Sequence, residues 1–166
     1  GNINYSFISY SEQGRQIDFP KYTLPVIEFL ADLGVDARFE GKNNLMAGSS
    51  KISGNAGHVQ GERVLHHGTL LFNSHLNVLS DVLRKDTTAY MTKAVKSIPL
   101  PVMNLKDTIP GITDSKQFKR KMLEFFLSRT SENTEIGLLP GELKKILALA
   151  ESKYRTWEWN YAYGPE

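Results

Sequence analysis

The stretch from Gly41 to Phe72 constrains this chain more than any other, because it combines two strand-like runs with an unusual concentration of small residues. Glycine and polar residues separate runs that are rich in β-forming side chains, a pattern that predicts a hairpin. We expect a first strand over about Lys51–Gln60, a turn near Gly61-Glu62 and a second strand over about Arg63–Phe72. The hairpin is the first structural prediction for the chain.

The first strand of this hairpin has very little side-chain bulk, since Ser53, Gly54, Ala56 and Gly57 are all small. A glycine inside a strand usually marks a bulge or a place where a ligand or another backbone comes close. Lys51 precedes these residues, and a lysine is a compact positive charge suited to a phosphate or a polarised carbonyl. Two interpretations stay open: a bulged hairpin with nothing bound, or a strand on which a ligand lies within reach of the lysine.

Hydrophobic periodicity and turn residues predict the remaining elements. The strands are expected over Asn4–Ser9, Val35–Glu40 and Trp157–Tyr161, with an extended segment over Ser97–Leu105. The helices are expected over Pro20–Leu33, Leu76–Leu83, about Lys116–Arg129 with Asp114 or Ser115 as its cap, and Gly141–Tyr154. Strands that come mainly early and helices that come mainly late predict an α+β fold, with a mostly antiparallel sheet flanked by helices. At 166 residues we expect one domain, residues 1–166.

Composition and motifs exclude several classes of function. The absence of cysteine excludes disulfides, thiolate metal sites and a cysteine nucleophile within these residues, and makes the cytoplasm the default location. A net charge of +2 without clustered basic stripes does not indicate nucleic acid as a partner. No apolar run is long enough for a membrane span, so we expect no membrane partner. Phosphate-binding Walker and dinucleotide glycine motifs are also lacking.

The adjacent pair His66-His67 lies in the second predicted strand, where successive side chains point to opposite faces. One metal ion cannot easily bind both, so we expect one histidine to pack inward and the other to be solvated, with no metal site. A metal bound at this pair is the less favoured alternative.

Six segments follow one another along the chain and are informative as a set. They are Gly1–Phe7, Gly41–Leu45, Lys51–Ala56, His66–Leu71, Val102–Leu105 and Thr156–Tyr161. Together they resemble, in the same order, motifs of the lipoate–protein ligase family in the biotin/lipoate ligase superfamily. Lys51–Ala56 is similar to its K-[IV]-S-G-[NS]-A signature, and His66–Leu71 to H-H-G-T-L-L. The resemblance covers nearly the whole chain.

The resemblance implies a biotin/lipoate ligase-like catalytic domain whose sheet holds lipoate and an adenylate. Such enzymes use ATP and Mg²⁺ to form lipoyl-AMP from lipoate. They then pass the lipoyl group to a lysine of a lipoyl carrier domain, in E2 subunits of 2-oxoacid dehydrogenases or the H protein of glycine cleavage. Lys51 matches the family's essential lysine, expected to bridge the lipoate carbonyl and the α-phosphate. The implied substrate- and adenylate-binding residues are Asn43, Asn44, Ser53, Gly54, Asn55, Ala56, His67, Gly68 and Thr69.

The chain also departs from the family pattern. It begins after the position of the family's glycine-rich segment and ends at Glu166 without the accessory C-terminal domain, so we expect a partial catalytic domain. Asn44 stands where an aspartate is usual, and a neutral amide is a poorer Mg²⁺ ligand. Pro99-Leu100-Pro101 replaces two arginines that would grip phosphate. That proline-containing variant resembles members that accept preformed lipoyl-AMP.

Several functions therefore stay open at this point. The first is ATP-dependent attachment of lipoate to carrier lysines through lipoyl-AMP. The alternatives are a transferase that uses only preformed lipoyl-AMP, and a non-catalytic fragment that binds lipoate or the carrier. Transferases that take octanoyl or lipoyl groups from a carrier protein use a cysteine acceptor, which these residues lack.

Overall fold

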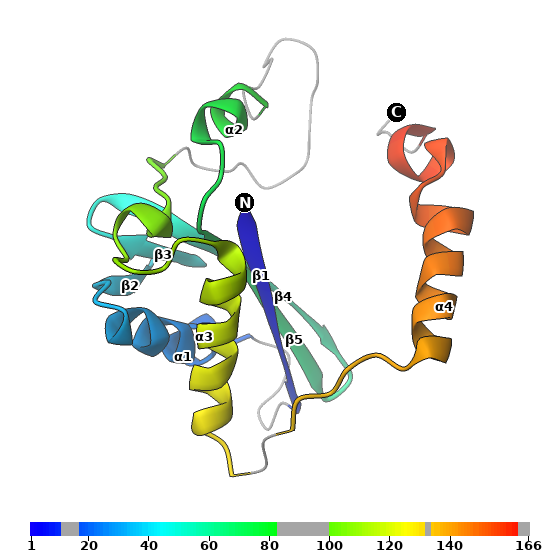
Figure 1. Cartoon of the computed structure of the whole chain (residues 1–166), viewed down its shortest axis with the longest axis horizontal. Helices are drawn as coiled ribbons and strands as arrows, with labels where there is room; N and C mark the ends of the chain where they lie inside the picture. Colours follow the sequence, from blue (N-terminus) through cyan, green and yellow to red (C-terminus); the bar gives the residue numbers. More distant parts are fainter. Residues whose placement is uncertain (11–16, 83–99, 132–133, 163–166) are drawn as a thin grey trace. The chain divides into compact units, whose positions relative to one another are not determined.

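The computed structural model describes residues 1–10, 17–82, 100–131 and 134–162, which belong to two compact units, Gly1–Arg129 and Thr130–Glu166 (Figure 1). The first unit contains strands β1 (Asn2–Tyr10), β2 (Ala37–Glu40), β3 (Asn44–Ala47), β4 (Ser50–Gln60) and β5 (Arg63–Leu71). Its helices are α1 (Phe19–Asp32), α2 (Leu76–Val82), the short η1 (Leu105–Asp107) and α3 (Ser115–Ser128). The expectation of one domain over residues 1–166 stays a prediction.

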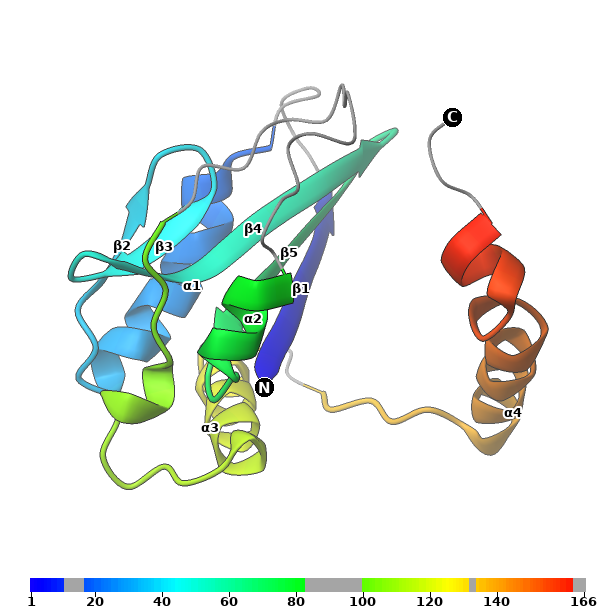
Figure 2. The same ribbon diagram turned by 90° about the horizontal axis from the view of Figure 1, so that it is seen from above.

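The five strands form one sheet in the order β1-β5-β4-β3-β2, and every neighbouring pair is antiparallel (Figure 2). This confirms the predicted α+β fold with an antiparallel sheet. The predicted hairpin is confirmed as β4 and β5, with Gly61 at φ +60° in its turn. Strand β3 lies inside the glycine-rich stretch and was not among the predicted strands.

One face of the sheet is buried under helices α1 and α3, which lie beside each other (Figure 1). The strands contribute Ile3, Leu45 and Leu70 to this core. Phe29 of α1 packs edge-on against Phe118 of α3, with ring centroids 5.2 Å apart. We call this side of the sheet the core face.

Helix α3 begins where the sequence predicts. The Asp114 carboxylate accepts the backbone N–H groups of Lys116 at 2.7 Å and Gln117 at 3.0 Å, the geometry of an N-cap. The hydrogen bond from Gln117, followed by that from Lys116, holds the pKa of Asp114 below its ordinary value. The predicted cap is confirmed.

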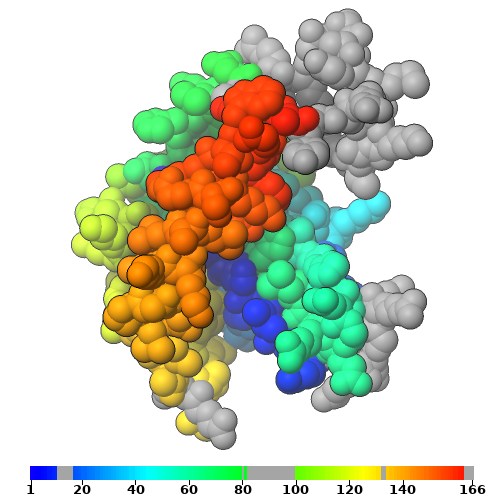
Figure 3. Space-filling model, turned by 90° about the vertical axis from the view of Figure 1, so that its right-hand side faces the viewer, coloured from blue at the N-terminus to red at the C-terminus, as the bar shows by residue number. Residues whose placement is uncertain are grey.

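The second unit consists of helix α4 (Pro140–Leu149) and two π-helical turns, η2 (Ala150–Tyr154) and η3 (Glu158–Ala162). The predicted apolar stripe of its helix, Leu143, Ile146, Leu147 and Leu149, is exposed. Figure 3 shows the atoms of this unit in orange and red.

The predicted strand at Trp157–Tyr161 is wrong, because Trp157 is helical and Glu158–Tyr161 lie in the helical turn η3. Local hydrogen bonds explain the difference: the hydroxyl of Thr156 accepts the N–H of Trp159 at 3.2 Å, and the Asn160 amide donates to the carbonyl of Thr156 at 2.8 Å. Side chains that satisfy backbone groups in this way compete with sheet pairing.

Among the described residues, no helix has both the length and the apolar character needed to cross a membrane.

Candidate functional site

The start of β4 departs from regular strand geometry. Lys51 is paired with Met46 of β3, but the next pair joins Ser53 to Leu45, so the register shifts between them. Two residues of β4 therefore lie opposite one residue of β3, which is a β-bulge. Beyond the bulge, Gly54 is on the same face as Lys51, whereas strict alternation would place Ser53 there.

The side chain of Lys51 lies along the strand above Gly54. A Cβ atom at position 54 would be 3.3 Å from Nζ of Lys51, so any larger residue would push the amine away. Partial burial lowers the pKa of Lys51 from its ordinary value. Within the described part of the chain, no carboxylate forms an ion pair with this amine. The positive charge is therefore available to an anionic ligand.

Several other predicted residues share this face, which we call the site face. Directly opposed residues of antiparallel strands lie on one side of a sheet. Gly54 is opposite Asn44 on β3 and Thr69 on β5, and Ala56 is opposite His67. The site face thus combines the lysine with two small residues and a rim of neutral polar groups, and none of these side chains is fully buried. A flat ligand with an anionic group can lie against such a surface.

Three of the predicted binding residues lie on the opposite, core face. Ser53 and Asn55 are 1% and 3% exposed, and Gly68 is buried directly opposite Asn55. The hydroxyl of Tyr5 on β1 donates to Oδ1 of Asn55 at 2.6 Å, crossing over Gly68 to do so. A Cβ atom at position 68 would collide with both partners of this hydrogen bond. Gly68 is thus required for the close approach of Tyr5 and Asn55.

Asn55 also fixes the turn that precedes β3. Its backbone N–H and its Nδ2 both donate to the carbonyl of Asn43, at 2.9 and 3.0 Å. The Asn43 amide donates in return to the carbonyl of Asn55 at 2.5 Å. Nδ2 of Asn55 also reaches Oγ of Ser53 at 3.3 Å. These bonds tie the residues before β3 to the middle of β4.

Tyr5 belongs to this buried network and was not among the predicted site residues. Burial raises its pKa to about 12, against a smaller opposing effect of the hydrogen bond with Ser53. The alternation of Asn4–Ser9 already places Tyr5 on the inward face of its strand, and that pattern was the available signal.

The two adjacent histidines point to opposite faces, as predicted. His67 is exposed on the site face, whereas His66 is 0% exposed and stacks on Tyr22 with ring centroids 5.1 Å apart. Phe7 and Phe19 also contact His66, and neither of its ring nitrogens has a hydrogen-bond partner among the described residues. Burial, and then the nearby charge of His67, lowers the pKa of His66. His66 is therefore a neutral core residue.

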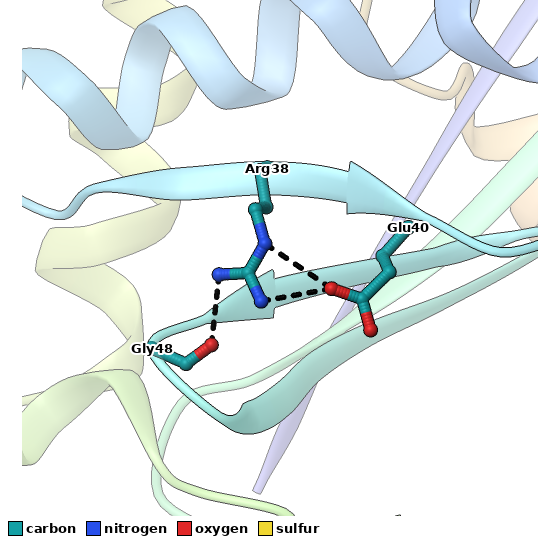
Figure 4. Close-up of polar contacts among 3 residues, drawn as sticks. All are labelled: Arg38, Glu40 and Gly48. Atoms are coloured by element: carbon teal, nitrogen blue, oxygen red, sulfur yellow. Dashed lines mark hydrogen bonds and ion pairs between the residues drawn. The ribbon is translucent and has the colours of Figure 1, made fainter.

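The acidic group nearest to Asn44 in the sheet is already paired. Glu40 is opposite Asn44 on the edge strand β2, and its carboxylate accepts hydrogen bonds from Arg38 at 2.8 and 3.1 Å (Figure 4). The same guanidinium donates to the carbonyl of Gly48 in the β3–β4 turn at 2.8 Å. The described residues contain no group of three histidine, cysteine or acidic side chains that could hold a metal ion.

Comparison with known proteins identifies the family of the chain. Residues 1–127 match the model of the lipoyl protein ligase A/B catalytic domain. The chain belongs to this family. Among curated relatives, lipoate–protein ligase 1 of Staphylococcus aureus is 34% identical over 166 residues, and lipoate-protein ligase LplJ of Bacillus subtilis is 30% identical over 168. The alignments cover 100% of this chain but 50% and 51% of the relatives, so the chain spans about half their length.

Solved structures of lipoate–protein ligases share the fold. A lipoate-protein ligase A bound with ATP superposes with a TM-score of 0.71 at 25% identity, covering 96% of this chain and 64% of the other. A bipartite lipoate protein ligase from Thermoplasma acidophilum, determined in a study that included its E2 lipoyl domain, gives a TM-score of 0.72 at 24% identity. That alignment covers 100% of this chain and 66% of the other.

Proposed function

We propose that this chain attaches lipoate to proteins, by holding lipoyl-AMP on the site face and transferring the lipoyl group to a lysine of a lipoyl carrier domain. The observation that supports this most directly is the amine of Lys51, which forms no ion pair with a described carboxylate and lies above Gly54 on a face of small and neutral polar residues. Family membership supports it as well, since the curated relatives are lipoate–protein ligases and one structural relative was solved with ATP.

Lys51 supplies the electrostatic part of the proposed reaction. In transfer, the amine of the carrier lysine attacks the lipoyl carbonyl carbon, a C–N bond forms, and the C–O bond to AMP breaks. AMP leaves with the electron pair, and the attacking amine loses a proton to solvent. Negative charge develops on the carbonyl oxygen and on the departing phosphate, and a cation that reaches both stabilises the transition state. In the preceding activation step, a lipoate oxygen attacks the α-phosphorus of ATP and pyrophosphate leaves.

The small residues of β4 determine how close the ligand can come. Gly54 and Ala56 leave room for the acyl-adenylate against the strand, while Asn44, His67 and Thr69 offer polar groups around it. Four further residues do not contact the ligand in this proposal. We propose that they support the site through the buried hydrogen-bond network that keeps β4 rigid; they are Asn43, Ser53, Asn55 and Gly68. A rigid strand limits the reorganisation needed when charge develops.

The residues near Asn44 do not fit a tightly held Mg²⁺ ion. Mg²⁺ is usually bound through one or two carboxylates together with substrate phosphates. Here the side chain at position 44 is a neutral amide, and the carboxylate opposite it, Glu40, is neutralised by Arg38. No step is therefore assigned to a metal held by these residues. This observation favours a second candidate function, in which the chain transfers lipoate from preformed lipoyl-AMP without activating it.

Intact-mass spectrometry of an apo lipoyl domain tests the proposal and separates the two candidates. The chain is incubated with the domain and either lipoate plus ATP·Mg²⁺ or preformed lipoyl-AMP. A lipoyl adduct in both reactions supports a complete ligase, and an adduct only with lipoyl-AMP supports a transferase. Loss of the adduct in Lys51→Ala supports the assigned site. An unchanged adduct in that variant, or none with the wild-type chain and lipoyl-AMP, would contradict the proposal.

A further inference from the structure

The backbone of Lys51 is held by a segment that is far away in the sequence. Its N–H donates to the carbonyl of Pro101 at 2.7 Å, and its carbonyl accepts the N–H of Met103 at 3.3 Å. Val102 thereby forms a parallel bridge with Lys51. Residues 100–105 include the described part of the predicted extended segment, and two of them bind both backbone polar groups of the lysine.

This contact occurs where the sheet itself defines Lys51 least well. The register between β3 and β4 shifts at the bulge, so the regular ladder that would fix the strand is interrupted beside Lys51. A bulge leaves one residue unpaired and bends the strand locally. The direction of the lysine side chain therefore depends on the segment 101–103 as well as on β3.

Asn104 anchors this segment to the residues that follow β5. Its Oδ1 accepts the backbone N–H of Ser74 at 2.8 Å, and its Nδ2 donates to the carbonyl of Ser74 at 2.9 Å. The side-chain amide thus pairs with both backbone groups of one residue, as a neighbouring strand would. Asn104 is only 8% exposed, and the N–H of Lys106 donates to the carbonyl of Phe72 at 3.0 Å beside it.

We propose that Asn104 is a positioning residue for Lys51. Its paired hydrogen bonds to Ser74 fix residues 101–103, and these residues fix the backbone of the lysine at the bulge. An asparagine suits this place because one planar amide presents a donor and an acceptor side by side. The importance of this position for activity rests on the proposed function, in which Lys51 must reach the carbonyl and the phosphate together. A displacement of about 1 Å in such a group can cost roughly a hundredfold in rate.

Amide hydrogen exchange, followed by NMR, measures the positioning without reference to activity. In Asn104→Ala, the amides of Lys51 and Met103 should exchange at least about tenfold faster, because their hydrogen bonds open more often. Amides in the β1–β5 ladder should change no more than global stability requires. Thr23→Val is the control, since it removes a different buried hydrogen-bonding group, the hydroxyl that donates to the carbonyl of Phe19 at 2.8 Å in α1. That variant should not single out Lys51 and Met103.

A milder second variant keeps the test informative if Asn104→Ala folds poorly. Asn104→Asp keeps the acceptor for the Ser74 N–H but loses the donor to its carbonyl, so its exchange at Lys51 and Met103 should lie between wild type and Asn104→Ala. Unchanged exchange at these two amides in both variants would overturn the positioning role.

The rate of lipoyl transfer from lipoyl-AMP to the lipoyl domain completes the test. We expect Asn104→Ala to lower the rate constant by about tenfold to a hundredfold, and Thr23→Val to leave it nearly unchanged. Faster exchange with a normal rate of transfer would also overturn the proposal. Normal transfer by Lys51→Ala would instead show that the proposed function has the wrong site, whatever the exchange data show.

Discussion

The two faces of the hairpin β4–β5 are built in opposite ways from alternate residues of the same strands. On the core face, Tyr5 and Asn55 meet over Gly68 without spare room, and their polar atoms are paired. On the site face, Gly54 and Ala56 leave space, and the Lys51 amine has no acidic partner among the described residues. The comparison suggests that the core face supplies stiffness and the site face supplies room and charge. Substitutions on the two faces should therefore separate stability from binding.

The largest expected effect is on the core face, at Gly68. A Cβ in Gly68→Ala would collide with Tyr5 and Asn55, forcing their hydrogen bond apart within a packed interior. We expect the free energy of unfolding to fall by about 3 kcal/mol, the upper end of the cost of overpacking. Chemical denaturation measures this. A loss within experimental error would show that the network has room to move and that the core face is not rigid.

Tyr5→Phe should have the next largest effect. It leaves Oδ1 of Asn55 buried without its donor, which costs about 1–2 kcal/mol of unfolding free energy at neutral pH. The pH dependence has a defined sign. Because the folded state raises the pKa of Tyr5 to about 12, the unfolded chain loses this proton first, near its ordinary value of 10.0.

The stabilisation of wild type over Tyr5→Phe should therefore be fully present below pH 10 and decline as the pH rises towards about 12. Denaturation of both proteins at several alkaline pH values checks this, since the other tyrosines cancel in the difference. A constant difference across that range would contradict the buried, protonated state of Tyr5.

Gly54→Ala is the site-face counterpart of Gly68→Ala. The added Cβ would lie 3.3 Å from Nζ of Lys51, the flexible end of a side chain that can move aside. We expect the free energy of unfolding to change by less than about 0.5 kcal/mol, whereas the affinity for lipoyl-AMP should fall on the order of tenfold because the amine is displaced. Denaturation and calorimetry on the same sample make the comparison. Equal losses at positions 54 and 68 would remove the distinction between the faces.

The smallest expected effect on stability is that of Lys51→Met. Burial disfavours the charged lysine in the folded protein, so replacing it with an apolar side chain of similar length should leave the free energy of unfolding unchanged or slightly higher, within about 0.5 kcal/mol. Thermal denaturation at neutral pH measures this difference. A clear loss of stability would mean that Lys51 stabilises the fold, which would contradict a role for this side chain in ligand binding alone.

Much of this fold could be predicted because its signals are local. The β4–β5 hairpin follows from two strand-like runs around Gly61-Glu62, and α3 from the Asp114 cap. Strand β3 was missed because only Asn44–Ala47 form it, between turns rich in glycine. The strand predicted at Trp157–Tyr161 was wrong because the local pattern there was misleading. Alternating aromatic and polar residues resemble a strand, but the hydrogen bonds of Thr156 and Asn160 stabilise a helical turn.

The residues proposed for the candidate site could be named from the sequence, but the faces on which they lie could not, and three of them lie on the core face. Strict alternation would group Lys51 with Ser53 and Asn55, and only the bulge places it with Gly54. A bulge depends on how two strands pair, which the sequence of one strand does not determine. The contribution of Asn104 depends on a contact with Ser74, thirty positions earlier, and no local pattern reports such a contact.

Calorimetric titration of lipoyl-AMP into wild type and Lys51→Met tests the central claim most directly. The account predicts binding by the wild-type chain and an affinity about tenfold to a hundredfold lower in the variant, the loss expected for one charge-assisted hydrogen bond to a phosphate. Unchanged unfolding stability in the variant would confirm that the loss is local. Equal affinity in the two proteins would contradict the claim that Lys51 on the site face binds the acyl-adenylate.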